Sequence, residues 1–301
     1  MQRKAIPVIL HTDLGTDIDD SWAILMMLRQ KQLRPLMILT DTGDAAYRAA
    51  IVARMLETAG RTEIEIGLGC DSELGPRTKT LEKWMKGYRL AKYPGKVYKD
   101  GAARAVELIR ASKEPVTLVS IAPCPAVAKM LKAAPDIAEK VNFVGMFGSV
   151  HKKYNGEPGR CAEYNVRIDI PAAKRVLEAP WRSVVLTPLD TCGLVQLDRK
   201  LYAEMLSSKD KDVKLLMDSV EAWKKNYPGK YNGVSSILFD TVAIHLASSY
   251  KYLQMNELNI LVDKQGRTCP NRRYGKPMQV AVEWTDLPAY HRFLVDTLLD
   301  K

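Results

Sequence analysis

Four aspartates lie within eight positions near the start of the chain, directly after a short apolar run. They are Asp13, Asp17, Asp19 and Asp20, in the stretch HTDLGTDIDD at 11–20. Carboxylates this close raise one another's pKa, so a nearby positive charge is the simplest way to keep them ionised. Helix capping by Asp19 or Asp20 is the ordinary alternative, but it needs one aspartate and leaves three unexplained. The stretch therefore predicts a cation site.

The residue types indicate which cation this would be. Aspartates offer only oxygen ligands, and oxygen-rich sites favour hard cations such as Ca²⁺ or Mg²⁺. The stretch lacks the glycine position and the terminal glutamate of an EF-hand loop. The five cysteines form no CxxC pair and are odd in number, so we expect neither a thiolate zinc site nor a disulfide framework. Cys124 and Cys192 follow strand-like runs and are expected to be buried thiols.

Strand-like runs alternate with helical patterns over the first 190 residues. The run at 6–13 precedes a helical pattern at 20–33, and the run at 35–43 precedes a pattern that ends on Gly60. The alternation continues with expected strands at 62–69, 116–123, 142–149 and 182–190, and expected helices at 101–112, 126–141 and 171–180. Such alternation is typical of βαβ units with a parallel sheet and right-handed crossovers.

The rest of the chain completes one fold. Beyond residue 195 the pattern is mainly helical, with a short hairpin near 258–283, and no linker or fixed-period repeat interrupts the sequence. We therefore predict an α/β fold, a single domain over residues 1–301, with a mostly parallel central sheet flanked by helices and a helical C-terminal part. Polar residues such as Asp41 and Asp190 gather at the predicted carboxyl ends of the strands, where such sheets bind ligands.

Composition limits the classes of partner. The 301 residues carry a formal net charge of +10 and a pI of about 9.2, but the lysines and arginines are scattered, so no nucleic-acid partner is expected. No apolar run is long enough to span a membrane. The N-terminal apolar run is too short for a signal peptide, so the default expectation is a cytoplasmic protein; an exported protein whose leader was removed is equally consistent.

The aspartate stretch also resembles a known signature. TDLGTDIDDSWAI is similar to D-T-D-x-G-x-D-D-x-x-A of the inosine–uridine nucleoside hydrolase family, with two extra residues before the aspartate pair and His11 in place of the first aspartate. Further segments match the family's motifs in chain order: MILTDTGD, LVSIAPCPAVAKML, GEPGRCAEYNVRIDIPAA and LFDTVAI. The resemblance identifies the chain as a divergent member of this family. It implies a nucleoside-hydrolase-like fold and a homo-oligomer, a dimer or a tetramer.

The resemblance implies a Ca²⁺ site built from distant parts of the chain. Asp13, Asp20 and Asp240 would ligate the ion, and Pro125 would add its backbone carbonyl oxygen, a group that proline keeps. Asp13 would also be the catalytic general base for a metal-bound water that attacks C1′ of a nucleoside or related ribosyl compound. The N-glycosidic bond of such a substrate breaks through a transition state with oxocarbenium character.

The resemblance also implies which residues bind the sugar. Asp19, Glu163 and Asn165 would bind ribose hydroxyls. Asp44 and Glu157 occupy positions where the family has asparagine, and both replace a hydrogen-bond donor with negative charge beside the substrate. These two substitutions affect the affinity expected for an ordinary nucleoside.

Two features depart from the family pattern. Phe239 occupies the place of a histidine that can protonate the departing base, so leaving-group activation must come from elsewhere or be weak. Asp17 falls in the insertion, where it either supports the ligands from behind or is exposed. Aromatic side chains at 72–100 and in NYPGKYNG at 226–233 either stack on a base or pack within their loops.

Three functional hypotheses follow. The first is a Ca²⁺-dependent N-ribohydrolase, with the preferred base left open. The second is a ribose- or nucleoside-binding protein on the same scaffold with weakened catalysis, for which Phe239 is the main argument. The third is a Mg²⁺-dependent phosphohydrolase with an aspartate nucleophile, because DLGTD loosely resembles D-x-D-G-T; Gly15 stands where the second aspartate would be. Ribose release excludes the third, and turnover separates the first two.

Overall fold

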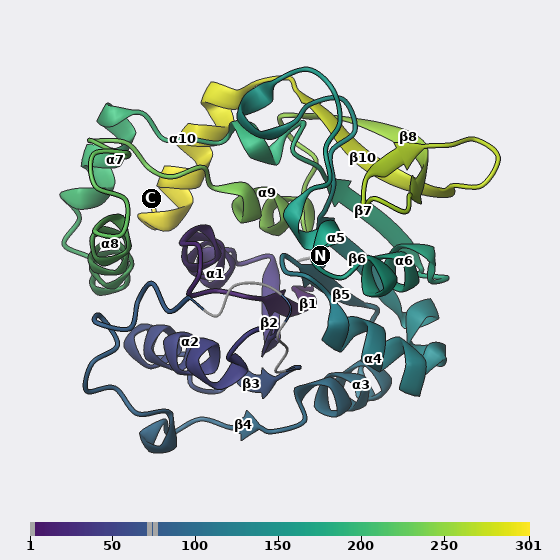
Figure 1. The fold of residues 1–301 in the computed structure, drawn as a ribbon. Coiled ribbons are helices and arrows are strands. Elements are labelled where there is room, and N and C mark those ends of the chain that lie inside the picture. Colours follow the sequence, from purple (N-terminus) through teal and green to yellow (C-terminus); the bar gives the residue numbers. More distant parts are fainter. Residues whose placement is uncertain (1–3, 71–73, 75–77) are drawn as a thin grey trace.

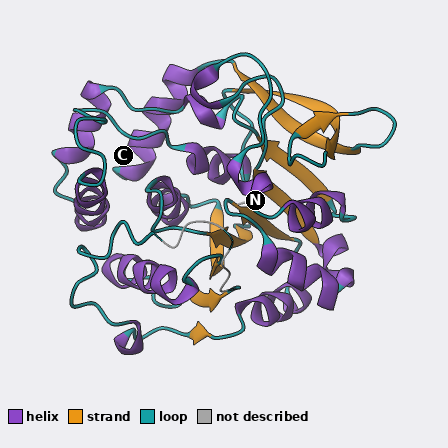
Figure 2. Ribbon diagram, in the orientation of Figure 1, coloured by secondary structure: helices purple, strands orange, loops and turns teal. Residues whose placement is uncertain are grey.

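A ten-stranded sheet crosses the molecule in the computed structural model, which describes residues 4–70, 74 and 78–301 (Figures 1 and 2). Its strands are β1 (Ile6–Thr12), β2 (Leu33–Thr40), β3 (Glu65–Leu68), β4 (Val97–Tyr98), β5 (Val116–Ser120), β6 (Val141–Met146), β7 (Ser183–Thr187), β8 (Leu253–Val262), β9 (Thr268–Pro270) and β10 (Lys276–Trp284). Their spatial order is β4-β3-β2-β1-β5-β6-β7-β10-β8-β9. All pairs from β4 to β10 are parallel, and only β10–β8 and β8–β9 are antiparallel.

Helices cover both faces of this sheet (Figure 1). They are α1 (Asp19–Arg29), α2 (Ala45–Ala59), α3 (Gly101–Ala111), α4 (Pro125–Ala133), α5 (Tyr164–Arg167), α6 (Ile170–Glu178), α7 (Arg199–Leu206), α8 (Lys211–Lys224), α9 (Phe239–Leu246) and α10 (Leu287–Leu298). Short 3-10 helices occur at Leu90–Lys92, Pro135–Lys140, Tyr154–Gly156 and Cys192–Leu194. The predicted fold class, a mostly parallel central sheet flanked by helices, is confirmed.

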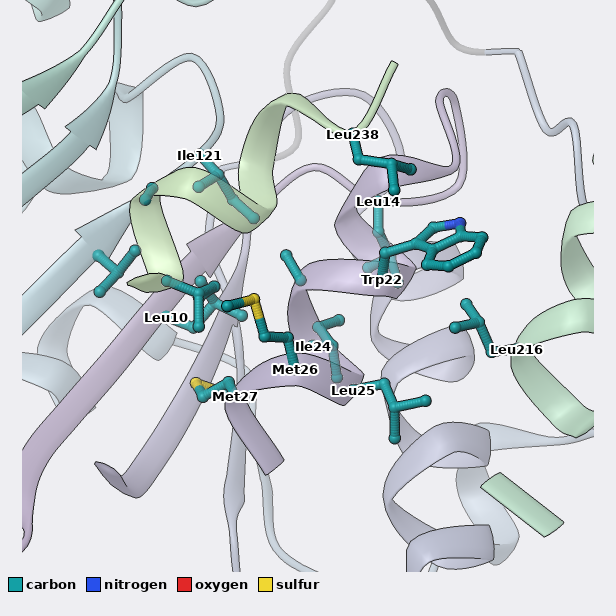
Figure 3. Packing of buried hydrophobic residues seen from close by; sticks show 14 of the residues in the cluster. Leu10, Leu14, Trp22, Ile24, Leu25, Met26, Met27, Ile121, Leu216 and Leu238 are labelled. Atoms are coloured by element: carbon teal, nitrogen blue, oxygen red, sulfur yellow. The ribbon is translucent and has the colours of Figure 1, made fainter. Parts of the chain in front are cut away.

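Two apolar clusters, one on each face, form the core. Helices α1, α2, α8, α9 and α10 pack on one face, and α3, α4 and α6 pack on the other. Helix α1 is buried through most of its length, and Figure 3 shows Trp22 and Leu25 directed toward Leu216 of α8. Helix α1 therefore belongs to the core, and its first residues are held firmly at the carboxyl end of β1.

Two predicted elements differ in detail. The helical pattern at 126–141 is divided, because α4 ends at Ala133 and a 3-10 helix starts at Pro135; proline has no N–H to continue the helical hydrogen bonds. The hairpin near 258–283 exists but is longer, since β8 starts at Leu253 and β10 ends at Trp284. Because β10 pairs in parallel with β7, this hairpin extends the central sheet.

Within the described part of the chain, every helix is too short or too polar to cross a membrane.

A close approach of backbones gives a stability prediction. A Cβ atom on Gly67 of β3 would lie 2.7 Å from Cα of Gly101, where α3 begins. The backbone of α3 must shift to admit it, so we expect Gly67→Ala to destabilise the protein by about 1–3 kcal/mol. Gly193→Ala is the matched control, because the nearest atom to its Cβ is 3.6 Å away. Thermal unfolding checks this, and equal midpoints for the two variants would contradict it.

Candidate active site

A cavity of about 250 Å³ opens at the carboxyl ends of the parallel strands. Asp13 reaches it just after β1, Ile121 just after β5, and Met146 at the end of β6. Six carboxylates line this cavity: Asp13, Asp17, Asp19, Asp20, Glu163 and Asp240. This is the sheet edge at which α/β folds bind ligands, so the cavity is the candidate active site.

Three of these carboxylates form a tight, buried cluster. Asp19, Asp20 and Asp240 are each no more than 4% exposed, and each offers an oxygen within 4.8 Å of the others. Asp19 and Asp20 are the first two residues of α1, and Asp240 is the second residue of α9. The N-cap of α1 is Ile18, and no side chain caps this helix end. The aspartates therefore do not serve as caps, which removes the ordinary explanation for them.

The charge of this cluster is only partly compensated by the described side chains: Arg48 and the Thr12 hydroxyl favour the ionised form of Asp20, but burial outweighs them. Burial, together with the neighbouring carboxylates, raises the pKa of Asp19, Asp20 and Asp240 well above the usual range. No lysine, arginine or histidine occurs among the described residues that line the cavity. A cluster of oxygen donors with unbalanced negative charge fits a hard divalent cation. These residues could hold such an ion, and a bound ion would remove the cost of ionising them.

Asp13 lies in the same cavity but outside the tight cluster. Burial raises its pKa to about 6, although the Arg48 guanidinium and His11 oppose the shift. Arg48, buried in α2, donates hydrogen bonds to the backbone carbonyls of Asp13, Leu14 and Thr42. It therefore fixes the backbone of the loop at 13–18 between β1 and α1, called the acidic loop below. Asp13 is a carboxylate of raised pKa held on a rigid backbone, which suits a general base.

The acidic loop is anchored on its other side as well. Thr12 Oγ1 donates to Asp20 Oδ1 at 2.5 Å, which orients that carboxylate. The carbonyl of Thr16 accepts from Trp223 Nε1 at 3.1 Å and from Thr80 Oγ1 at 3.1 Å. Asp17 is exposed at the cavity mouth, where its carboxylate accepts the N–H of Ile18. The residue as a whole is exposed, yet burial raises the pKa of its carboxyl, and its charge raises the pKa of Asp19 and Asp20. Neither alternative for Asp17 is therefore excluded.

Glu163 and Asn165 line the cavity from the start of α5, where Glu163 is the N-cap residue. Glu163 is 2% exposed and accepts backbone N–H groups from Gly148, Asn165 and Val166 at 3.0, 2.7 and 3.3 Å. Burial raises its pKa to about 7, against the effect of these three hydrogen bonds. The Asn165 amide donates to the carbonyl of Met146 at 3.0 Å. Both side chains are held by the backbone, so their positions are fixed before any ligand binds.

Three aromatic rings complete the wall. Tyr154, Tyr164 and Phe239 line the cavity, and Tyr154 meets Phe239 edge to face, with ring centroids 6.2 Å apart. The hydroxyl of Tyr154 accepts the N–H of Tyr164 at 3.0 Å. The cavity thus has an acidic part around the cluster and an aromatic part around Phe239.

Three predicted site residues lie elsewhere. Asp44 caps α2 and forms an ion pair with Lys79 at 2.7 Å, Glu157 is exposed, and Pro125 is the first residue of α4. Among the described residues, these three are absent from the cavity lining. The roles that the resemblance implied for them stay predictions. Asp13, Asp19, Asp20, Glu163, Asn165 and Asp240, by contrast, are brought together.

The histidine of the signature has a buried structural position. His11 Nδ1 lies 2.8 Å from Ser120 Oγ, and His11 Nε2 lies 2.8 Å from Asp41 Oδ2, with all three residues at 0% exposure. Asp41 Oδ2 also accepts the N–H of Ala126 in α4. Although the residue types match a catalytic triad, none of them lines the cavity. This network connects β1, β2, β5 and α4 beneath the site.

Some residues of the site have no clear signal in the sequence. Tyr154 comes from an irregular loop, and only its aromatic type could have drawn attention to it. Arg48 is a charged residue within the otherwise apolar buried stripe of α2, which is a detectable pattern. The predicted buried thiols Cys124 and Cys192 are confirmed, at 0% exposure.

The aromatic residues singled out in the two loops pack against neighbouring residues. Arg54 lies over the ring of Trp84, and Tyr88 donates to Glu57. The rings of Tyr227 and Tyr231 pack on Trp223. Positions 72, 73 and 75–77 of the first loop lie outside the described residues.

Several known proteins are similar to this chain in sequence or in fold. The chain is 29% identical over 207 residues to the pyrimidine-specific ribonucleoside hydrolase RihA of Escherichia coli O1:K1 / APEC, a match that covers 64% of this chain and 63% of that protein. The plant nucleoside hydrolase PpNRh1 has a TM-score of 0.84 at 19% identity, with 98% of this chain and 99% of that chain covered. The purine-preferring ribonucleoside hydrolase from Gardnerella vaginalis has a TM-score of 0.79 at 20% identity, with 98% of each chain covered.

The solved structures, at this level of identity, show that the fold is shared. Membership of a family rests on a different finding. The family model described as inosine-uridine preferring nucleoside hydrolase matches residues 8–293, which includes every residue of the acidic cluster. This confirms the resemblance read from the sequence: the chain belongs to the inosine-uridine preferring nucleoside hydrolase family.

Proposed function

We propose that this protein is a Ca²⁺-dependent hydrolase that cleaves the N-glycosidic bond of a nucleoside or related ribosyl compound. The observation that carries the proposal is the meeting, in one cavity, of the buried Asp19–Asp20–Asp240 cluster with Asp13, Glu163 and Asn165. The membership of the family and the name of the RihA relative support it. The family membership also argues against the Mg²⁺-dependent phosphohydrolase.

In this proposal each residue of the cavity has a separate role in the reaction. Asp13 accepts a proton from the water that attacks C1′, and its raised pKa places it near the range useful for a general base. Glu163, Asn165 and Asp19 hold the ribose hydroxyls, and the backbone hydrogen bonds of Glu163 fix the sugar's orientation. A calcium ion, when bound, would lower the pKa of water and orient the sugar diol.

The negative charge of the cavity has a second role in this proposal. C1′ and the ring oxygen become positively charged as the glycosidic bond breaks. Six carboxylates around the cavity provide fixed negative charge near that centre, and such preorganised charge stabilises the transition state more than the ground state.

A second candidate function is a ribose- or nucleoside-binding protein that has lost efficient catalysis. One observation favours it: Phe239 lines the cavity and cannot donate a proton to a departing base. A substrate whose leaving group needs no proton separates the two candidates. We also propose the family's dimer or tetramer as the assembly, which light scattering after size-exclusion chromatography tests.

The first prediction concerns turnover. We expect p-nitrophenyl riboside to be hydrolysed with added Ca²⁺ and to stay intact with excess EDTA, because its leaving group needs no acid. Asp13→Asn should lower kcat by about 10²–10⁴-fold, the usual contribution of a general base. Asp218→Asn, at an exposed position on α8, is the matched control and should retain activity. Binding of ribose without any turnover would favour the binding protein.

The second prediction concerns stability and pH. The pKa values of Asp13, at about 6, and Glu163, at about 7, are raised in the folded state. The folded protein therefore binds protons that the unfolded chain has released, and without metal its stability should fall as pH rises from about 4 to about 7. Ca²⁺ should counter this loss, so its stabilising effect on Tm should be larger at about pH 7.5 than at about pH 5.

The variant Asp240→Asn tests whether Ca²⁺ stabilises the protein by binding at the Asp19–Asp20–Asp240 cluster. Removing one of three mutually repelling carboxylates should raise the Tm of the metal-free protein and abolish most of the Ca²⁺-induced increase. Thermal unfolding with EDTA and with Ca²⁺ gives both quantities. A Ca²⁺ effect of unchanged size in this variant would place the ion elsewhere.

A further inference from the structure

Among the described residues, the lining around Phe239 includes no histidine or cationic side chain that could serve as a general acid. Cleavage of an ordinary nucleoside leaves an anionic base unless a proton is supplied to it. The helix position next to the cluster is Phe239, directly before Asp240. Any proton for the leaving group must therefore come from a histidine elsewhere, a tyrosine or a carboxylic acid.

The histidines do not provide this acid. Both ring nitrogens of His11 are engaged with buried partners, and His245 is buried with Nε2 bonded to the carbonyl of Lys251. His151 lies in an exposed loop position, and His291 belongs to α10. None of these four histidines is part of the cavity lining, as far as the structure describes the chain.

The two tyrosines of the lining are poor acids, and its carboxyl groups, Asp17 apart, are assigned in the proposed function to the metal, the attacking water or the ribose. Burial raises the pKa of Tyr154 and of Tyr164 above that of a free phenol, so their hydroxyls hold their protons more strongly. Glu163 uses both carboxylate oxygens as acceptors, Oε1 for the N–H of Asn165 and Oε2 for those of Gly148 and Val166. Burial raises its pKa to about 7 in spite of these hydrogen bonds, so Glu163 carries a proton part of the time near neutral pH. The proposed function, however, places this side chain at the ribose hydroxyls and not at the departing base.

The charge of the cavity also favours a leaving group that needs no proton. Its lining holds six carboxylates and, within the described residues, no cationic side chain. Even with one divalent cation bound, fully ionised carboxylates would leave the cavity negative. The aromatic faces of Tyr154, Tyr164 and Phe239 attract cations as well, through the negative charge density of their rings. A positively charged aglycone is favoured by every one of these features.

We infer that the substrate of this site is a ribosyl compound whose aglycone carries a quaternised, positively charged nitrogen, such as an N-ribosylpyridinium or an N7-alkylated purine nucleoside. This inference rests on the proposed function, and it names the substrate class. A 5′-phosphate is disfavoured, because the described residues of the cavity lining include no cationic side chain to bind it.

The chemistry of such a substrate balances without a general acid. The C1′–N⁺ bond breaks and its electron pair returns to the ring nitrogen, so the aglycone leaves as a neutral base. The oxygen of water forms the new bond to C1′. Asp13 takes the proton from that water and later releases it to solvent, and the products are free ribose and the neutral aglycone.

The test compares matched substrates with the holoprotein in Ca²⁺. Guanosine and 7-methylguanosine differ by one methyl group and its positive charge, and nicotinamide riboside supplies the pyridinium case. We expect kcat/KM for 7-methylguanosine and for nicotinamide riboside to exceed that for guanosine by at least about 100-fold, the lower range of what a missing acid costs. Nicotinamide mononucleotide, which adds a 5′-phosphate, should react at least about 10-fold more slowly than nicotinamide riboside.

Variants at Phe239 separate a missing acid from the intrinsic reactivity of the cationic substrates. Phe239→His should raise kcat/KM for guanosine at least about 10-fold more than that for 7-methylguanosine, because only guanosine needs a proton. Phe239→Leu, the control, removes the ring without adding an acid. It should weaken the preference for 7-methylguanosine over guanosine by the contribution of one ring, but should not raise kcat/KM for guanosine as Phe239→His does.

Hydrolysis of p-nitrophenyl riboside shows whether a negative result contradicts only the inferred substrate class or the proposed function as well. If this compound is cleaved while guanosine and 7-methylguanosine react equally well, the inference is overturned and the proposed function stands. If neither it nor any cationic substrate is cleaved, both are overturned. Equal rates for nicotinamide riboside and its 5′-phosphate would overturn the discrimination against phosphate.

Discussion

The mutual repulsion of buried carboxylates is the constraint on which the rest of this structure depends. Asp19, Asp20 and Asp240 are held within 4.8 Å of one another, away from water and from any cationic side chain in the described lining. Two unit charges about 4 Å apart repel by about 4 kcal/mol at the effective dielectric of a protein surface. That is a large part of a typical net stability of about 5–15 kcal/mol. Full ionisation of the cluster is therefore costly, which is why the pKa of each aspartate is raised. The fold holds these residues together either in protonated form or around a cation.

The scaffold meets this demand with backbone and core contacts. Helix α1 begins at Asp19 and is buried almost to its end, so Trp22 and its neighbours fix where the aspartate pair lies. Helix α9, which carries Asp240, packs against α1 within the same apolar cluster. Beneath the site, Asp41 joins His11 and the start of α4. The apolar contacts thus supply the energy that holds the charged groups together.

The sequence predicted the site residues that lie at the ends of strands or at the starts of helices. Strand and helix periodicity located the ends of β1 and β5, and the topology of a parallel sheet brings such ends to one edge. Asp13, Asp19 and Asp20 follow directly from that reasoning. The family motifs added Glu163, Asn165 and Asp240, which no spacing argument connects with residue 13.

Side-chain direction was the part that periodicity could not predict. Asp44 follows β2 at the correct edge, yet it turns to cap α2 and pairs with Lys79. Glu157 lies in an irregular loop and is exposed, while Tyr154, three residues earlier, lines the cavity. The direction of each of these side chains depends on its own hydrogen bonds and ion pairs, some of them with residues far away in the sequence. A pattern of apolar residues does not predict such contacts.

The two extra residues of the acidic loop, Asp17 and Ile18, lie in different surroundings. Ile18 enters the core at 0% exposure, while Asp17 remains exposed at the cavity mouth. Strand β1 is held by the sheet and α1 by the apolar core, so the place of the cluster depends on these two elements more than on the length of the loop between them. The loop itself is fixed by Trp223, Thr80 and Arg48. The side chain of Asp17 therefore contributes to the charge and shape of the cavity entrance, while the buried cluster is positioned by the elements on either side of the loop.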